Sequence, residues 1–231
     1  MAPLLYGFMP YRKVPLATGE IYHVFNRSVA KQPIFLTDGD YNRALEVINF
    51  YRFGSLPLRF SHYKRLPTDQ RKDFTEDLTK TGRQIIVILS FCLMPNHFHF
   101  LLKPLEDKAT SIFMRKFQDS YSKYFNTKQK RTGSLFQAMF KAVRIETDDQ
   151  LIHVSRYIHL NPTSSHVVKA ESLSDYPWSS YKEFIKEKNE FITDTKSILD
   201  YFKSRESYKK FVLDQADYQS KLDLIKHLAL E

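Results

Sequence analysis

Hydrophobic and polar positions alternate most clearly in the middle of the chain, at residues 94–99, which read MPNHFH. An apolar run precedes this stretch, and the proline and asparagine inside it are typical of a tight turn. The pattern predicts two neighbouring strands, at 85–93 and 97–103. Because side chains alternate between the faces of a strand, His97 and His99 should share one face and Phe98 should point to the other.

The remaining patterns predict a sheet covered by helices. Alternation with β-branched and aromatic residues predicts two more strands, and apolar residues at helical spacing predict three helices, the last ending at Pro162. These elements are expected at residues 20–27, 38–51, 107–129, 134–145 and 148–162. The order is strand, helix, strand, strand, helix, strand and a final helix. It predicts an α+β fold, a ferredoxin-like βαββαβ antiparallel sheet with helices on one face.

We divide the chain of 231 residues into three parts. Residues 1–18 hold three prolines and little periodicity, and we interpret them as an N-terminal arm. Residues 19–185 should form the folded domain, with a basic insertion at about 54–83. Residues 186–231 should form a helical C-terminal extension. The insertion is either a solvated loop or a segment that contacts nucleic-acid phosphates, and the sequence leaves both interpretations open.

Composition and charge narrow the class of protein. A hydrophobic content of 42% and an aromatic content of 15% are typical of a globular protein. The net charge of +9 favours a polyanionic partner, with nucleic acid preferred over an anionic membrane surface. The single cysteine, Cys92, excludes a disulfide within the chain and a cysteine-rich zinc site. No apolar run is long enough to span a bilayer, so we expect a cytoplasmic protein without a membrane partner.

The two histidines of the MPNHFH stretch are the first candidate for chemistry. Two imidazoles on one strand face can chelate a single metal ion, although such a pair can also be structural. Tyr157 and Asn161 lie four residues apart in the last predicted helix, so they share one helix face and offer a nucleophile and a third ligand. His23 has no partner near it in sequence, and we interpret it as an ordinary strand-face residue.

Four short motifs, in this order, resemble the REP-associated tyrosine transposases. These proteins are relatives of the single-strand insertion-sequence transposases within the HUH endonuclease superfamily. The resemblance covers roughly residues 18–185. The motifs are MPNHFH at 94–99, GSLFQ at 133–137, YIHLNP at 157–162 and YPWSSY at 176–181.

The resemblance implies a nuclease that cuts and joins single-stranded DNA near imperfect hairpins. Tyr157 would be the nucleophile and would become joined to a 5′ phosphate, and His97, His99 and Asn161 would bind a divalent metal. The insertion-sequence branch tends to place glutamine where this chain has Asn161, and either side chain offers an amide oxygen. Such a ligand set suits Mg²⁺ or Mn²⁺. The expected partner is single-stranded or hairpin DNA, and a monomer is favoured over a homodimer.

Further residues are candidates for DNA contact or for rival roles. Basic side chains and one histidine are expected to contact DNA: Lys64, Arg65, Arg71, Lys72, Lys141, Arg144 and His153. Tyr121 and Tyr124 are rival nucleophiles, because they also follow the histidine pair. Two other classes of function stay open: a non-catalytic protein that binds single-stranded or hairpin nucleic acid, and an RNA-binding protein with structural histidines.

Overall fold

A four-stranded antiparallel sheet forms the centre of the molecule. The computed structural model describes residues 16–186 and 192–214, and the sheet order is β2-β3-β1-β4. This is the order that a βαββαβ chain gives in a ferredoxin-like fold, so the predicted α+β class is confirmed. The strands are β1 (Ile21–Arg27), β2 (Ile86–Met94), β3 (His97–Pro104) and β4 (Lys141–Ile145).

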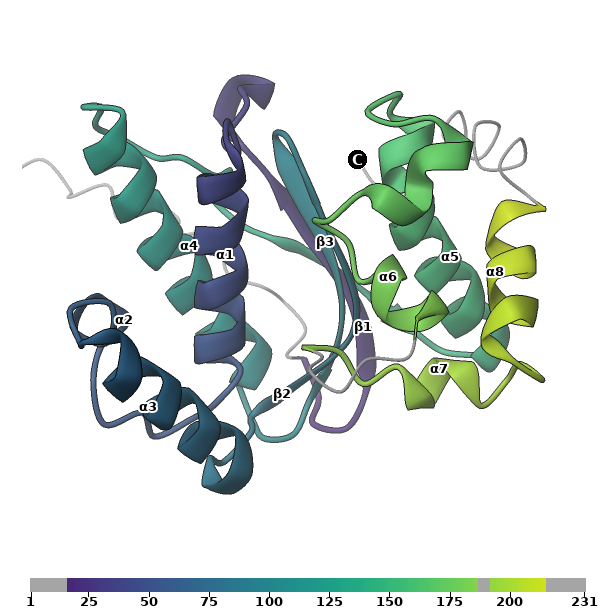
Figure 1. Cartoon of the computed structure of the whole chain (residues 1–231), viewed down its shortest axis with the longest axis horizontal. Coiled ribbons are helices and arrows are strands. Elements are labelled where there is room, and N and C mark those ends of the chain that lie inside the picture. The colour runs from purple at the N-terminus through teal and green to yellow at the C-terminus, as the bar shows by residue number, and fades with distance from the viewer. Residues whose placement is uncertain (1–15, 187–191, 215–231) are drawn as a thin grey trace, which may run out of the picture.

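Two long helices cover one face of the sheet. They are α1 (Asp38–Tyr51) and α4 (Ala109–Lys128), which lie side by side in Figure 1. Phe98 and Phe100 of β3 point to this face, and the ring of Phe98 lies 5.1 Å from that of Phe117 on α4. The aromatic side chains on the inner face of α4 are therefore part of the hydrophobic core.

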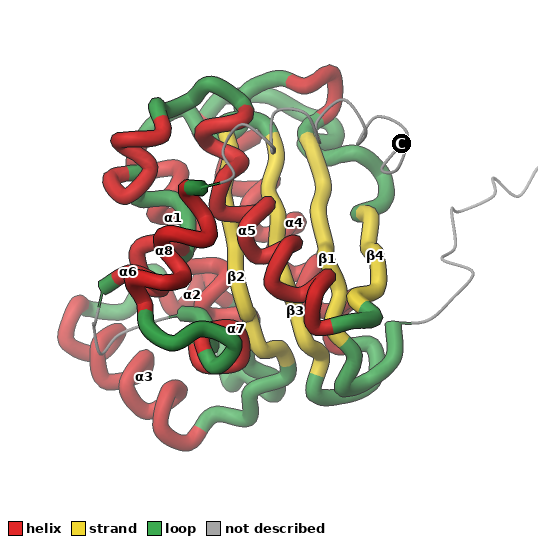
Figure 2. Tube along the Cα trace, turned by 90° about the vertical axis from the view of Figure 1, so that its right-hand side faces the viewer, coloured by secondary structure: helices red, strands yellow, loops and turns green. Residues whose placement is uncertain are grey.

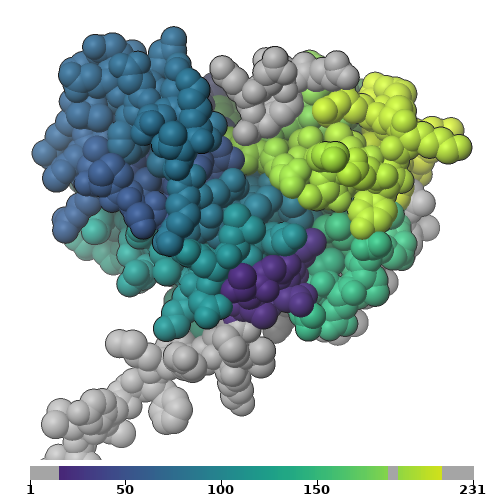
Figure 3. All heavy atoms as spheres, turned by 90° about the horizontal axis from the view of Figure 1, so that it is seen from below, coloured from purple at the N-terminus to yellow at the C-terminus, as the bar shows by residue number. Residues whose placement is uncertain are grey.

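The opposite face carries the helix with the tyrosine motif. This helix, α5 (Asp148–Ser164), runs in front of the strands in Figure 2, mainly over β2. Shorter helices follow it along the chain and pack beside it, as the yellow-green surface of Figure 3 shows. They are η2 (Ala170–Asp175), α6 (Tyr181–Ile185), α7 (Lys196–Leu199) and α8 (Arg205–Leu213). Residues 1–15 of the expected arm and residues 215–231 of the expected extension lie outside the described part.

The basic insertion forms two helices, α2 (Phe60–Tyr63) and α3 (Thr68–Thr81). Phe74 of α3 stacks on Phe50 of α1 at 6.0 Å between ring centroids, so the insertion has its own apolar anchor. The insertion is therefore a helical segment attached to α1 by aromatic packing and not a loop. Across residues 16–186 and 192–214, no helix is both long and apolar enough to cross a membrane.

Two predicted boundaries are wrong. The last strand was expected over 134–145, but β4 begins only at Lys141. Phe136 makes only an isolated bridge to Ser28, and the regular ladder with β1 starts where Lys141 pairs with Phe25. The last helix continues past Pro162 to Ser164. A proline this near the end removes only one intrahelical hydrogen bond, and the Ser165 amide donates to the Asn161 carbonyl at 3.0 Å to close the last turn.

The buried carboxylate of Asp40 ties α1 to α4. Its Oδ1 accepts hydrogen bonds from Lys128 at 2.7 Å and from Tyr124 at 2.9 Å. Its Oδ2 accepts from the backbone amides of Leu36 and Thr37 at 3.1 and 3.0 Å. Burial would raise the pKa of this carboxyl, but the hydrogen bonds hold it below its ordinary value. The first turn of α1 therefore depends on a charged acceptor at this position.

The substitution Asp40→Asn should lower the free energy of unfolding by about 2 kcal/mol at neutral pH. The NH₂ group of asparagine is a hydrogen-bond donor, and it would face donors that now bond to a carboxylate oxygen. Asp38→Asn is the control, since Asp38 is exposed on the same helical turn. Denaturant unfolding of both variants measures the difference. Equal losses in the two variants would contradict this account of α1.

Candidate active site

The pairing of β1 with β3 places the two histidines on the face that α5 covers. His97 and His99 lie on this face with ring centroids 5.1 Å apart. Tyr157 reaches the pair from α5, and its ring stands edge-on to His99 at 5.5 Å. The structure therefore brings together a strand motif and a helix motif that lie about sixty residues apart in the sequence.

The site is partly covered. His99 is only 5% exposed, whereas His97 and Tyr157 are half-buried. His99 is covered because α5 packs across the middle of the sheet on this face. The described helices leave β4 largely uncovered on this face, as Figure 2 shows, and Val143 there is 45% exposed.

His23 also belongs to this cluster. Its Nε2 lies 2.9 Å from Nδ1 of His99, and its ring stands edge-on to Tyr157 at 5.7 Å. The sequence indicates no partner for His23, because His99 is 76 residues away and meets it only through strand pairing. The alternation of β1 was the available signal, since it puts His23 and Phe25 on one face, and Phe25 is paired with His99.

Each metal-candidate histidine is held at its Nδ1 atom. Nδ1 of His97 lies 2.6 Å from Oδ1 of Asn96, whose own Nδ2 donates to the Lys31 carbonyl at 3.0 Å. Because an amide oxygen only accepts, His97 must be the donor and carries its proton on Nδ1. In His99, Nδ1 faces His23. Nε2 is thus the nitrogen that either ring offers to a metal, with its orientation set by the hydrogen bond at the other end.

Asn161 lies one helical turn after Tyr157 and is 4% exposed. Its Nδ2 donates to the Tyr157 carbonyl at 3.1 Å, so the amide is anchored through its nitrogen and its oxygen is the atom suited to a cation. The described residues contain no cluster of three His, Cys, Asp or Glu side chains that could hold a metal. A metal at this site would therefore use two imidazoles, an amide oxygen and oxygens of its substrate, which is a donor set acceptable to Mg²⁺ or Mn²⁺.

The two basic residues of β4 that are candidates for DNA contact, Lys141 and Arg144, lie on opposite faces of the sheet. Lys141 pairs with Phe25, which also pairs with His99, so Lys141 shares the face of the histidines. Arg144 pairs with Tyr22 on the opposite face and forms an ion pair with Glu20 at 2.8 Å. Of the two, the structure brings only Lys141 to the face of the candidate site.

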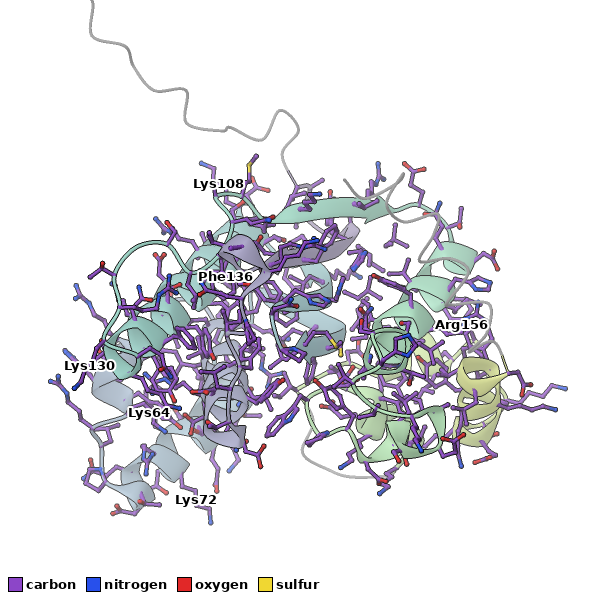
Figure 4. The ribbon with its side chains drawn as sticks, turned by 90° about the horizontal axis from the view of Figure 1, so that it is seen from above. Lys64, Lys72, Lys108, Lys130, Phe136 and Arg156 are labelled. Atoms are coloured by element: carbon purple, nitrogen blue, oxygen red, sulfur yellow. The ribbon has the colours of Figure 1, made fainter. Side chains whose placement is uncertain are left out.

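The cations of the insertion lie on the other side of the molecule. Figure 4 shows Lys64 and Lys72 at the far side from Arg156, which is on α5. Lys64 forms an ion pair with Glu46 at 2.7 Å. Lys72 lies 3.9 Å from Glu76, and its side chain is 77% exposed. Arg65 and Arg71 are in the same insertion, the first exposed and the second half-buried. All four residues belong to the insertion, which packs on α1 and not on the face that carries the histidines.

His153 takes part in contacts with α8. Its Nδ1 accepts a hydrogen bond from Arg156 at 2.8 Å, and its ring lies 5.5 Å from Phe211. Burial and the charge of Arg156 lower the pKa of His153. This neutral histidine helps to dock α8 on α5.

The rival tyrosines lie on the wrong face of the sheet. Tyr121 donates to the Ile34 carbonyl at 2.6 Å, and Tyr124 donates to Asp40. Both are on α4, which packs against Phe98 and Phe100 rather than against the histidines. Burial raises the pKa of both hydroxyls, which opposes formation of a phenolate.

A buried polar network fixes α5 to the C-terminal helices. His159 lies between Tyr208 of α8 and Ser180, with both ring nitrogens 2.8 Å from a hydroxyl. The Tyr208 hydroxyl also meets Ser155 of α5 at 2.7 Å. Burial lowers the pKa of His159 to about 3, so the ring is neutral at ordinary pH. The helix that carries Tyr157 is therefore held by hydrogen bonds as well as by apolar packing.

Replacing His159 should change how stability depends on pH. The unfolded chain protonates this residue below about pH 6.5, while the folded chain does so only near pH 3. Stability from the neutral ring is complete above pH 6.5 and falls by up to about 1.4 kcal/mol per pH unit below it. Between pH 7 and pH 5, the free energy of unfolding of His159→Gln should therefore fall by about 2 kcal/mol less than that of the parent.

Denaturant unfolding at the two pH values measures this difference, with His166→Gln as the control at an exposed site. The same pH dependence in parent and His159→Gln would show that the buried ring does not control the acid stability of this region.

Comparisons with known proteins agree with this geometry. Residues 64–161 match the family model described as IS200-like transposase, and this segment contains both histidines of the pair, Tyr157 and Asn161. No curated protein matches the chain. Among solved structures, that of a REP-associated tyrosine transposase bound to a REP hairpin matches with a TM-score of 0.51 and 15% sequence identity. The match covers 80% of this chain and 93% of that chain, and it bears on the fold. The resemblance found in the sequence is thus confirmed: residues 64–161 carry the match to the IS200-like transposases, on a fold shared with a REP-associated tyrosine transposase.

Proposed function

We propose that this protein is a metal-dependent endonuclease and strand transferase for single-stranded DNA at hairpin-forming sequences. The observation that supports this most directly is the contact of Tyr157 with His99, beside His97, within one chain. A nucleophile and two potential metal ligands are then in one place without a contribution from a second subunit. We therefore also propose that a monomer is sufficient for the reaction.

In the proposed reaction, the Tyr157 oxygen attacks a backbone phosphorus atom. A new bond forms between this oxygen and phosphorus, and the bond from phosphorus to the 3′ oxygen breaks. The phenol loses its proton, and the departing 3′ oxygen gains one to become a 3′ hydroxyl. The 5′ phosphate stays joined to Tyr157, so another 3′ hydroxyl can reverse the step and join strands. Transposition and the processing of REP-type elements both require such reversible cutting.

A divalent metal fits this proposal through His97, His99 and the Asn161 oxygen. When bound, such an ion would withdraw charge from the scissile phosphate and orient it. His23 and Asn96 would act on the ligands rather than on the substrate, because they hold the Nδ1 atoms of the two imidazoles. Tyr157 and Asn161 share one helix face, so one element delivers the nucleophile and the third ligand.

The proposed substrate combines an unpaired strand with a hairpin. The part of the sheet over β1 and β4 that the described helices leave uncovered suits single-stranded DNA, since Phe25 and Lys141 lie on that face. The basic surface of the insertion, made by Lys64, Arg65, Arg71 and Lys72, suits the phosphates of a hairpin stem. The REP hairpin bound to the structurally similar protein supports a hairpin ligand here.

Tyr157→Phe should abolish the covalent adduct and all cleavage while leaving DNA affinity nearly unchanged. The substitution removes one oxygen and keeps the ring that packs on His99. A denaturing gel of protein incubated with hairpin DNA and Mn²⁺ detects the adduct. Tyr121→Phe is the control and should still cut, because Tyr121 is on the opposite face. Normal cleavage by Tyr157→Phe would refute the proposed nucleophile.

His97→Ala should remove cleavage together with Mn²⁺ binding, as calorimetry measures it, and should leave the fold intact because the residue is half-buried at a strand end. His62→Ala, at an exposed position of α2, is the control and should bind Mn²⁺ as the parent does. Unchanged Mn²⁺ affinity in His97→Ala would exclude the proposed metal site.

A further inference from the structure

A hollow of about 360 Å³ lies beside His97, where β2 turns into β3. Its walls come from the end of β1, the η1 turn (Val29–Lys31), the β2–β3 turn and the residues that follow α5. In Figure 1 this is the upper end of the sheet, and α7 lies at the lower end. The volume is within the range typical of ligand sites, and the position next to a candidate metal ligand makes it adjacent to the proposed chemistry.

The charge of this hollow is entirely positive. Arg27 and Lys31 line it and both are exposed, and none of the described residues that line it is acidic. The register of the sheet pairs Arg27 directly with His97, so this cation is beside the candidate metal ligand. The hollow therefore favours an anionic group within reach of the site.

The backbone that presents Lys31 is strained and firmly held. Ala30 and Lys31 are consecutive non-glycine residues with φ of 55°, in the left-handed region. Such residues cost of order 1 kcal/mol each and persist where surrounding contacts enforce them, commonly at ligand sites. Here the enforcing contacts come from the β2–β3 turn, since the Pro95 carbonyl accepts from the Ile34 amide at 2.7 Å and Asn96 donates to the Lys31 carbonyl.

One side chain, Asn96, connects the hollow with the site. Its amide nitrogen bonds the Lys31 carbonyl at 3.0 Å, and its amide oxygen bonds His97 at 2.6 Å. The position of Lys31 is therefore fixed relative to His97 through two hydrogen bonds. An anion held by Arg27 and Lys31 would have a defined position relative to the proposed scissile phosphate.

We propose that this hollow binds the backbone phosphate next to the scissile one on the unpaired strand. Arg27 and Lys31 would hold that phosphate. Asn96, which bonds to both Lys31 and His97, would fix the position of the phosphate relative to His97. Phosphate contacts of this kind position a strand without reading its bases. The inference rests on the proposed function of the neighbouring site, and it assigns the single-stranded part of the substrate to this end of the sheet.

The test is DNA binding by the double variant Arg27→Gln, Lys31→Gly. Glycine tolerates the positive φ of position 31, so the backbone is kept while the charge is removed. Fluorescence anisotropy with a short oligothymidine in EDTA should show roughly tenfold weaker binding. The slope of log affinity against log salt should fall by about 0.7, since the variant loses one phosphate contact and each such contact on a single strand contributes about 0.7.

Two comparisons make the test specific. The variant should bind a hairpin with an unpaired tail more weakly than the parent does, and a blunt hairpin equally well. Replacement of the four basic residues of the insertion, Lys64, Arg65, Arg71 and Lys72, should weaken the binding of both hairpins. The control variant Lys196→Gln, Lys203→Gln loses two exposed charges at the opposite end of the sheet and should match the parent.

Unchanged oligothymidine affinity and salt slope would overturn the proposal, as would equal losses on tailed and blunt hairpins, which indicate only a diffuse basic surface. Because EDTA removes the need for metal and cleavage, the outcome is independent of the nuclease. If Tyr157 forms no adduct but the double variant still loses tail binding, the phosphate site stands and the proposed nuclease does not.

Discussion

The structure depends on the alternation of side chains along β3. Phe98 and Phe100 turn to α4 and complete the main core, while His97 and His99 turn to α5. One strand thus anchors the fold with one face and presents the candidate ligands with the other. A shift of one residue in its pairing would bury the histidines in the apolar core and expose the phenylalanines, so core packing and site geometry fix the same register.

The position of the nucleophile depends on a second layer that the ferredoxin-like core alone does not provide. Short helices after α5 pack beside it, and His159 joins α5 to Tyr208 and Ser180 through hydrogen bonds with both ring nitrogens. A buried network of this kind accepts few alternative arrangements, because any shift would leave polar groups unpaired. The C-terminal helices therefore hold the tyrosine motif against the sheet of the same chain.

Two groups of basic side chains that are candidates for DNA contact lie on different sides of the molecule. Arg27, Lys31 and Lys141 lie on or beside the histidine face, whereas Lys64 and Lys72 lie across the molecule on the insertion. A net charge of +9 would attract any polyanion, but this division favours a ligand with two parts. An unpaired strand attached to a hairpin stem is a ligand of that kind.

Much of the fold could be predicted from the sequence, because local periodicity reports which face of each element is buried. The strand alternation at His97–His99, the helix spacing of Tyr157 and Asn161 and the order of elements were sufficient for the ferredoxin-like sheet and for the pairing of the two motifs. The end of the helix at Pro162 and the start of the last strand were wrong, because local rules do not include the isolated bridge of Phe136 to Ser28 or the closing bond at Ser165.

Only the tertiary structure decided which distant residues meet. His23 joins His99 through strand pairing across 76 residues, and Asn96 joins Lys31 across 65. The separation of the insertion cations from the histidine face is likewise a result of packing. Periodicity encodes a residue's face but not its neighbour, and hydrogen bonds between strands and turns assign the neighbours only when the chain is folded.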